Sequence, residues 1–520
     1  MRSAWLWVIL AGGAALRVAL LMQAVHAEKR AFTPDSWDYW HLAGQMRGQT
    51  LVLPAPRDGL PWPQKLELPA RFGRSEEEPE IFRTPGYPGF LVVGWLRRQA
   101  GPELLGGWRL ALVIQVLIDV HLIGLTFLLG RTLAGRGAGL VAAALQAVSP
   151  LAIAASCRVL SDSLYAFLLT AAVLLMLRHL RGGGWASLAA SAVVLAAASY
   201  VRPVALAMAG VFAVVLLFGR RRFRRAGAFV GVTAALIAPW VVRNAVVADY
   251  VGFSSVTIDG LYYFSAAEVL AREQGISPQR ARARLREEER RRHEDMINEA
   301  AGAVDGLVIM KGSAYRPFGV KDVGPGVPTG PASQPAGGRR GDFAVRYFAA
   351  GPEPGGGGAR YRRRRALEII ARRPWLYARI HLTGCLAFWL PGATDVLEIA
   401  GRTTGGRGTL AVLHREGFLA AARHYFGGDA LAMALAAGMG LVLLIRYAGV
   451  VLCGLWRARG RLSAAGWLCL LLVAAAFLLP GPAAHPRFRV PVEPILSVAA
   501  AAGWLALIGA FRRVRRGAGD

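Results

Sequence analysis

The clearest candidates for chemistry are two acidic side chains near the start of the chain. The segment AFTPDSWDYWHLAGQM carries Asp35 and Asp38 three residues apart, on one face if the segment is helical. Thr33–Pro34–Asp35 is typical of a helix start, with a capping hydroxyl, proline at the first helical position and an acid near the positive end of the dipole. A carboxylate held there can remove a proton from an acceptor hydroxyl or amine. A purely structural role at the helix start is the alternative.

Two further acids lie in or beside apolar segments. Asp162 opens one of them, in RVLSDSLYAF, where capping by Ser161 or Asp162 is the favoured interpretation. The functional alternative is a second acid facing the same cavity as Asp35. Asp119 lies inside another apolar segment, and an ionisable group there needs a partner. We expect a structural ion pair between Asp119 and Arg17.

Cations follow the acids at the ends of several apolar segments. They occur in FRTPGYP, SYVRPVA, PWVVRNAV and HPRFRVPVEP, and they are Arg83, Arg202, Arg243, His485, Arg487 and Arg489. Each arginine singly can be a contact to a lipid head group. Because several separate loops each carry an arginine, binding of one shared anion is the better explanation. The expected anion is a lipid phosphate or pyrophosphate, because arginine forms bidentate charge-assisted bonds to phosphate oxygens.

Composition indicates the kind of structure that positions these residues. The 520 residues are 54% hydrophobic and 18% charged, with a formal net charge of +28. Such hydrophobicity excludes a disordered chain, and apolar blocks separated by arginines argue against a nucleic-acid binder. A membrane helix needs about 20 mostly apolar residues. We therefore predict an all-α polytopic membrane protein of about 10–12 spans, at 4–24, 108–130, 136–153, 160–178, 185–201, 203–219, 226–244, 431–455, 463–480 and 491–511, with a weaker stretch at 376–391.

Basic clusters at the span ends predict the orientation, because they collect on the cytoplasmic side. Placing them inside puts a long first loop, 25–107, and the cations named above on the extracytoplasmic side. With the basic clusters inside, the seventh span ends outside and the span at 431–455 must begin outside. The stretch 376–391 therefore cannot be a single simple crossing. We expect it to be interfacial or re-entrant, with a missed partner crossing in 392–430 as the alternative. An uncleaved first helix is preferred over a signal peptide ending at Ala27.

A second polar region follows the seventh span. ISPQRARARLREEERRRHEDMINEA pairs Glu and Arg at three- and four-residue spacings, which predicts a solvated helix, with contact to anionic lipid as the alternative. The stretch 321–360 is dense in Gly and Pro and is expected to be a flexible linker. We divide the chain into a catalytic module at 1–246, this charged region at 247–375 and C-terminal helices at 376–520.

The motifs together resemble the GT-C superfamily of polytopic glycosyltransferases, in particular the family of protein O-mannosyltransferases and lipid A aminoarabinose transferases (family 39-like). The resemblance is carried by DSWDYWHLAGQM, FRTPGYPGFLVV, the stretch from QVLIDVHL to RVLSDSL, YVRPVAL, PWVVRNAV and PRFRVPVEP, in this order. It implies a donor sugar linked to a polyprenyl phosphate, used on the outer face of the membrane. Asp35 matches the family's catalytic acid, Arg83 its phosphate-holding cation, and Arg487 or Arg489 the basic–aromatic pair before the last span.

The resemblance also implies partners and leaves some points open. The expected partners are the lipid-linked donor, a lipid, glycan or protein acceptor and the bilayer, without nucleic acid. The chain departs from the family at Ser36, where a second acid is often found, and at Asp162, where a Glu is common, so a divalent cation is left open. From the residues themselves we keep Asp162 as a second catalytic acid and Asp38, Tyr39 and Tyr87 as acceptor or sugar contacts. A polyprenyl-linked glycan flippase and an oligosaccharide ligase using a lipid pyrophosphate are the alternative functions. The preference for Arg over Lys suggests a GC-rich bacterial genome. Together with the predicted orientation of the spans, this places the protein in a bacterial inner membrane with its site on the extracytoplasmic side.

Overall fold

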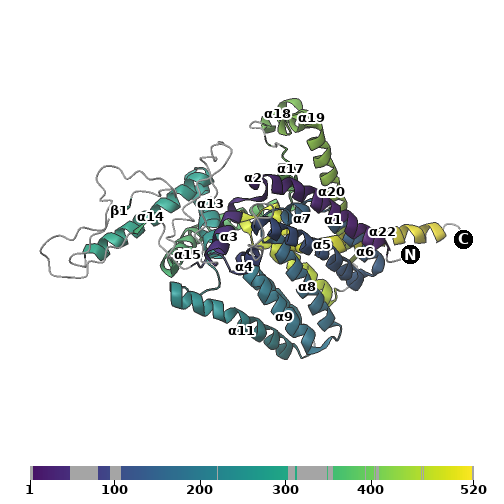
Figure 1. The fold of residues 1–520 in the computed structure, drawn as a ribbon, viewed down its shortest axis with the longest axis horizontal. Coiled ribbons are helices and arrows are strands. Elements are labelled where there is room, and N and C mark those ends of the chain that lie inside the picture. The colour runs from purple at the N-terminus through teal and green to yellow at the C-terminus, as the bar shows by residue number, and fades with distance from the viewer. Residues whose placement is uncertain are drawn as a thin grey trace, which may run out of the picture. The chain divides into compact units, whose positions relative to one another are not determined.

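The computed structural model describes residues 4–46, 80–93, 107–218, 221–302, 311–312, 348–349, 355–392, 394–402, 405, 409–457, 460 and 462–517. The chain forms two compact units. The first comprises Met1–Leu53, Phe82–Val242 and Trp375–Asp520, and the second Pro54–Ile81 and Arg243–Pro374. The described residues are overwhelmingly helical (Figure 1). The strands among them are β1 (Lys311–Gly312) and β2 (Phe348–Ala349), which pair in parallel.

The predicted all-α polytopic fold is confirmed. Seven described helices are apolar and long enough to cross a membrane, or up to eight if the bent pair α6 (Arg136–Ala147) and α7 (Pro150–Ser156) forms one span. The shorter apolar helices α10 (Ala205–Leu216) and α21 (Ala464–Leu478) correspond to two further predicted spans. The seven long helices are α1 (Ala4–His26), α5 (Gly107–Ala134), α8 (Asp162–Leu180), α9 (Gly184–Val201), α11 (Arg222–Ala248), α20 (Ala430–Arg457) and the last helix, α22 (Glu493–Gly517), with the turn before it.

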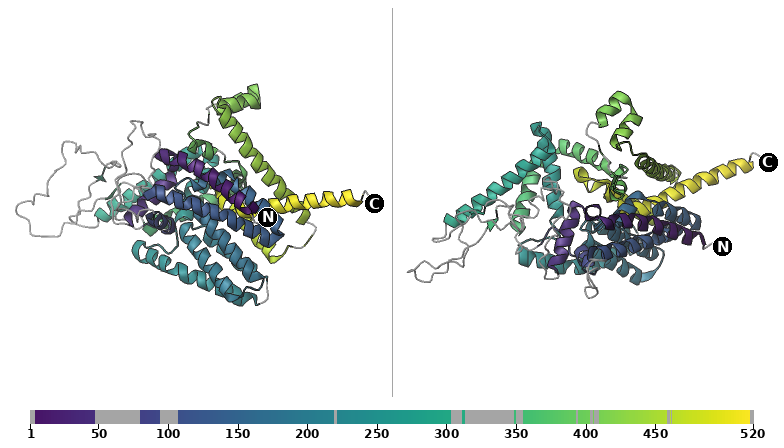
Figure 2. Two further views of the ribbon diagram at one scale, coloured as in Figure 1. Left: turned by 45° about the vertical axis from the view of Figure 1, so that its right-hand side comes forward. Right: turned by 45° about the horizontal axis from the view of Figure 1, so that its top comes forward.

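Small residues let neighbouring helices of the first unit approach closely. A Cβ on Gly130 of α5 would lie 2.7 Å from the Cα of Gly139 of α6, and one on Gly503 of α22 would lie 2.0 Å from the carbonyl oxygen of Gly449 of α20. Such small-residue contacts are characteristic of helix pairs in membranes. Figures 1 and 2 both show α8 and α9 side by side, joined by a short turn.

A break between α6 and α7 shapes the centre of the first unit. Pro150 cannot continue a helix, and Ser149 caps the new one by accepting a hydrogen bond from the backbone N–H of Ala152 at 3.4 Å. The two helices meet at 58°. The break leaves carbonyls at the end of α6 without helical partners, and Arg446 of α20 donates to one of them, Leu145 O, at 2.7 Å.

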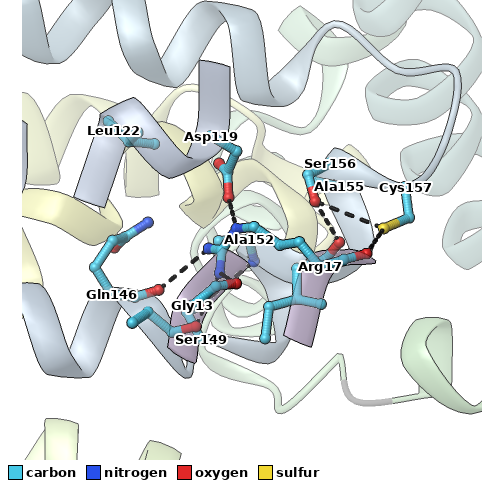
Figure 3. Close-up of polar contacts among 12 residues, drawn as sticks. Gly13, Arg17, Asp119, Leu122, Gln146, Ser149, Ala152, Ala155, Ser156 and Cys157 are labelled. Atoms are coloured by element: carbon cyan, nitrogen blue, oxygen red, sulfur yellow. Dashed lines mark hydrogen bonds and ion pairs between the residues drawn. The ribbon is translucent and has the colours of Figure 1, made fainter. Parts of the chain in front are cut away.

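Arg17 of α1 satisfies a second carbonyl at this break and confirms the predicted ion pair. Its Nε lies 2.5 Å from Asp119 Oδ2, and both side chains are fully buried. Its Nη1 donates to the carbonyl oxygens of Gly13 and Ala147, each at 2.9 Å. Figure 3 shows Arg17 between Asp119 and the α6–α7 break. The pair therefore joins α1, α5 and α6, because removing either charge leaves the other buried without a partner.

The segment predicted to be interfacial or re-entrant forms α16 (Pro374–Cys385), followed by a 3₁₀ turn, η3 (Leu386–Trp389). Twelve helical residues rise only about 18 Å, well short of the hydrocarbon thickness. The helices described between 392 and 430 are α17 (Thr394–Ile399), α18 (Thr409–Glu416) and α19 (Phe418–Tyr425), of six and eight residues. None of these described helices is long enough for the alternative of a missed crossing, and the interfacial or re-entrant placement stays a prediction.

The second unit is built around the predicted charged helix, α14 (Pro278–Gly302). The helix is not wholly solvated: Ala281, Leu285, Glu289 and His293, each four residues apart, are buried. Glu289 accepts from Arg362 of α15 (Gly355–Arg372) at 2.6 Å. The remaining helices of this unit are α12 (Val256–Gly260), the π-helix η2 (Leu261–Ala266) and α13 (Ala267–Gln274).

One part of the predicted Gly/Pro-rich linker is helical. Most of 321–360 lies outside the described residues, but Gly355–Gly358 form the first turn of α15. The prediction is wrong for these residues, because they continue into the helix over 359–372 and one of the glycines serves a close backbone approach. A Cβ on Gly356 would lie 1.8 Å from the carbonyl oxygen of Asp249, so only glycine fits.

Candidate active site

The N-terminus of α3 (Pro34–Gln45) positions the two predicted acids. Thr33 is the N-cap and Pro34 the first helical residue, so the predicted helix start is confirmed. Ser36 completes a capping box, because its Oγ accepts from the backbone N–H of Thr33 at 2.9 Å. Asp35 and Asp38 then point to one side of the helix, with side chains 18% and 8% exposed.

Arg83 connects both acids. Its Nη2 lies 2.8 Å from Asp35 Oδ1 and 2.8 Å from Asp38 Oδ2, and its Nη1 donates to the hydroxyl of Tyr39 at 3.2 Å. The guanidinium also lies over the Tyr39 ring, 4.7 Å from its centre. Burial acts to lower the pKa of Arg83, but Tyr39, Asp35 and Asp38 act more strongly, and its pKa lies well above the ordinary value. Arg83 is therefore a permanent cation at this position.

The turn after Arg83 is held against the end of α9. Gly86 begins α4 (Gly86–Val93), and a Cβ there would lie 2.6 Å from the carbonyl carbon and oxygen of Tyr200. Glycine thus permits the RTPGYP turn to pack on the backbone that leads to Arg202. Because of this contact, the cation before α4 and the cation after α9 lie on the same side of the unit.

Two further arginines complete the cluster. Arg487, in the 3₁₀ turn η5 (Pro486–Val492), pairs through Nη2 with Asp35 Oδ2. Arg202 pairs through Nη1 with Asp162 Oδ1. Both guanidinium groups lie 5.5 Å from the centre of the Phe488 ring, so one aromatic side chain supports both cations. We call Asp35, Asp38, Asp162, Arg83, Arg202 and Arg487 the acid–arginine cluster.

Tyrosines join the cluster to the membrane helices. The hydroxyl of Tyr39 lies 3.0 Å from Ser161 Oγ, beside Asp162, and its ring meets the Tyr87 ring edge-on at 4.8 Å. The Tyr87 hydroxyl donates to Gln115 Oε1 at 2.8 Å. Burial raises the pKa of Tyr87 well above its ordinary value, so its hydroxyl stays protonated and acts as a donor.

The remaining predicted cations have other surroundings. Arg489 is fully buried, and it donates to Phe388 O at 2.6 Å and to the Tyr447 hydroxyl at 2.7 Å. His485 caps η5 and accepts from the backbone N–H of Arg487 at 3.3 Å. Burial, followed by the charge of Arg487, lowers the pKa of His485. Arg243 belongs to the second unit, where it donates to Glu80 O at 2.7 Å.

The described residues contain no group of three or more His, Cys, Asp or Glu side chains that could hold a metal ion. The acids of the cluster face arginines instead: Asp35 contacts Arg83 and Arg487, Asp38 contacts Arg83, and Asp162 contacts Arg202. A divalent cation needs several free oxygen ligands. These residues therefore do not fit a metal site in this arrangement.

The structure adds residues that sequence reasoning missed. Arg158 lies close to Asp162 in the chain, and it pairs with Asp395 at 2.9 Å and Glu398 at 2.7 Å, both on α17. The Tyr165 hydroxyl, one turn after Asp162, is buried and makes no hydrogen bond among the described residues, and the same holds for Asp162 Oδ2. The sequence did offer a signal for Tyr165, because a residue three positions after Asp162 lies on the same face at the start of the helix.

One family model matches part of the chain. Residues 99–242 match the family model described as dolichyl-phosphate-mannose-protein mannosyltransferase. No curated protein matches the sequence. Two solved structures of an Archaeoglobus fulgidus oligosaccharyltransferase are similar to the chain. The apo form has 13% sequence identity and a TM-score of 0.45, and the match covers 99% of this chain and 52% of that one. The complex with an inhibitory peptide and a dolichol-phosphate has 13% identity and a TM-score of 0.46, and the match covers 98% of this chain and 51% of that one.

The chain spans about half the length of these oligosaccharyltransferase chains. The family-model match begins before α5 and ends within α11, so it covers the stretch that carries Asp162 and Arg202. Over residues 99–242 the chain is thus similar to the dolichyl-phosphate-mannose-protein mannosyltransferases, which agrees with the resemblance of the motifs that lie within this range.

Proposed function

We propose that the chain is an integral membrane glycosyltransferase. It moves a sugar from a polyprenyl-phosphate-linked donor to a lipid, glycan or protein acceptor on the outer face of a bacterial inner membrane. The observation that carries the proposal is the position of Asp35 between Arg83 and Arg487, an acid between two cations from distant parts of the chain. The description of the matching family, which names a dolichyl-phosphate mannose donor, supports a donor of this class.

The arginines of the cluster hold the donor phosphate in this proposal. Arg83 and Arg487 already bind carboxylate oxygens, and phosphate oxygens are acceptors of the same kind. Arg202 shares the Phe488 ring with Arg487 and extends the cationic surface. Three arginines face three aspartates, so an arriving phosphate competes with the carboxylates for the guanidinium groups. Donor binding thereby frees Asp35 from its ion pairs.

Asp35 acts as the general base. It accepts the proton of the acceptor hydroxyl or amine while the acceptor atom forms a bond to the anomeric carbon. The bond between that carbon and the phosphate oxygen breaks from the opposite face, the configuration inverts, and polyprenyl phosphate leaves as an anion. The arginines stabilise the charge that develops on this leaving group, and one such donor contributes roughly 10²–10³ in rate. General base catalysis contributes roughly 10²–10⁴.

Other members of the cluster orient the sugar and the acceptor. Asp162 has one oxygen on Arg202 and the other, Oδ2, without a hydrogen bond among the described residues. We assign it, with Asp38, Tyr39 and Tyr87, to contacts with sugar or acceptor hydroxyls. Arg489 and His485 position the η5 turn that carries Arg487, because Arg489 contacts Phe388, Tyr447 and Glu493 and His485 contacts the η5 backbone.

The test uses purified protein in proteoliposomes with three probes: dolichyl phosphate mannose, a lipid-pyrophosphate oligosaccharide, and a fluorescent lipid-linked sugar for translocation. The proposal predicts that the monophosphate donor is consumed and free dolichyl phosphate appears together with a glycosylated acceptor. Consumption of the pyrophosphate donor alone would instead indicate a ligase. Movement between leaflets without cleavage of the sugar–phosphate bond would indicate a flippase.

A further inference from the structure

A small cavity lies at the end of the first unit opposite the acid–arginine cluster. It has a volume of about 100 Å³, more than one water molecule needs, and the residues that line it are His179, Gly182, Gly184, Trp185, Arg221 and Arg225. Three of these six residues are basic and none is acidic. The proposed sugar transfer uses none of them.

The position of the cavity follows from α8. Asp162, which pairs with Arg202, is the first residue of this helix, and His179 lies at its other end. Nineteen helical residues rise about 28 Å, close to the hydrocarbon thickness of a bilayer. The cavity and the acid–arginine cluster therefore lie at opposite membrane surfaces.

His179 lines this cavity and holds the turn between α8 and α9. Its Nδ1 lies 2.7 Å from the carbonyl oxygen of Gly184, and since a carbonyl only accepts, Nδ1 carries a hydrogen. Gly182 and Gly184 have φ of +98° and +72°, which permits the tight turn that brings this carbonyl to the ring. The side chain is only 4% exposed, so His179 fixes the turn that borders the cavity.

The arginines of the cavity point to an anion. Arg221 adopts a left-handed backbone conformation, with φ of 54°, which is unfavourable for a residue with a Cβ and is found mostly where function or packing requires it. Arg225 follows one turn later on α11 and is half-buried. Trp185 is 47% exposed beside them, as is typical of aromatic side chains at a membrane interface.

We propose that this cavity binds a phosphate group supplied by the head group of an anionic lipid. Arg221 and Arg225 pair with phosphate oxygens. Trp185 packs against the glycerol and upper acyl region of the same lipid. Basic pockets between membrane helices at one membrane surface bind anionic head groups in this way, and soluble phosphate would use the same donors.

The test is lipid binding to the full-length protein in detergent, followed by native mass spectrometry with cardiolipin and with phosphatidylcholine. The double variant Arg221→Gln/Arg225→Gln removes the cavity arginines. The matched control, Arg222→Gln/Arg224→Gln, removes the same charge from exposed neighbours that do not line the cavity. A wild-type melting temperature in both variants establishes that both are folded.

The proposal predicts about 25-fold weaker cardiolipin binding for the cavity variant, from about fivefold for each arginine near a lipid surface, and less than about threefold for the control. Equal losses in the two variants, or no loss in either, would overturn it. A second arm adds millimolar inorganic phosphate to the wild-type complex. Retention of cardiolipin supports a lipid source, whereas its displacement by phosphate overturns the lipid assignment in favour of a soluble anion.

Discussion

Asp35 and Arg487 lie 452 positions apart in the chain and form an ion pair, Arg487 Nη2 to Asp35 Oδ2. The first residue belongs to the start of α3 and the second to the turn before the last helix. The acid therefore receives one of its two cations from the N-terminal region and the other from the C-terminal region. Both regions are needed to complete the cluster, and a module ending at 246 would lack Arg487.

Replacing Arg487 by glutamine should reduce kcat/KM by roughly 10²–10³, because one oriented cation is lost from the leaving phosphate. The matched control is Arg415→Gln, an exposed arginine on α18, which should leave turnover unchanged. The measurement is sugar transfer from dolichyl phosphate mannose. Equal activity of the two variants would exclude Arg487 from the phosphate site.

Replacing Gly86 by alanine should impair activity through the position of Arg83. The new Cβ would lie 2.6 Å from the backbone of Tyr200, so the RTPGYP turn must shift. A Cβ on Gly89, one turn later on α4, would meet nothing within 4 Å, and Gly89→Ala should be neutral or stabilise by about 0.5–1 kcal/mol. The measurements are turnover and melting temperature of the two variants. Wild-type turnover and stability in Gly86→Ala would contradict the close approach.

The contact between α20 and α22 should also be disturbed by an added Cβ. A Cβ on Gly503 would lie 2.0 Å from the Gly449 carbonyl oxygen, whereas one on Gly509 meets nothing within 4 Å. Gly503→Ala should therefore lower the melting temperature by several degrees, as overpacking costs about 1–3 kcal/mol. Gly509→Ala is the control on the same helix. A Gly503→Ala protein as stable as this control would show that the helices can separate freely.

The pH dependence of stability should report on His485. Burial and the charge of Arg487 lower its pKa below 6.5, and Asp395, Asp162 and Asp35 oppose this effect only in part. The unfolded chain then binds the proton more readily than the folded protein, so stability falls as the pH drops below about 6.5. Protonation also removes the Nδ1 lone pair that accepts from Arg487 N–H.

The variant His485→Asn keeps a capping oxygen without a titratable ring. We expect its melting temperature to exceed that of the wild type increasingly as the pH falls from 7 to 5, relative to their difference at pH 8. Parallel curves for the two proteins over this range would show that His485 does not titrate with folding.

Local signals explain what could be predicted from the sequence. The Thr-Pro-Asp start of α3 needs only neighbouring residues, and the spans follow from long apolar runs. The partner of Asp119 was predictable because a buried charge requires an opposite charge, and Arg17 lies in an adjacent apolar segment.

Other features depend on contacts between residues that are distant in the chain, and these could not be predicted from the sequence. Arg487 and Arg489 are two residues apart in the same motif, but only the first reaches Asp35, while the second donates to Phe388 O. The buried face of α14 was hidden because Glu289, a charged residue, occupies a core position opposite Arg362. Arg158 was missed because its partners lie on α17, a helix too short to show a hydrophobic pattern.

The central claim is that Asp35 removes the proton from the acceptor. Asp35→Asn keeps the size of the side chain and removes its charge, and Asp249→Asn is a matched control at an exposed site in the second unit. The measurement is single-turnover sugar transfer from dolichyl phosphate mannose in membranes that contain equal amounts of each protein. The account predicts a loss of roughly 10²–10⁴ for Asp35→Asn and wild-type rates for Asp249→Asn. Wild-type turnover in Asp35→Asn would contradict it.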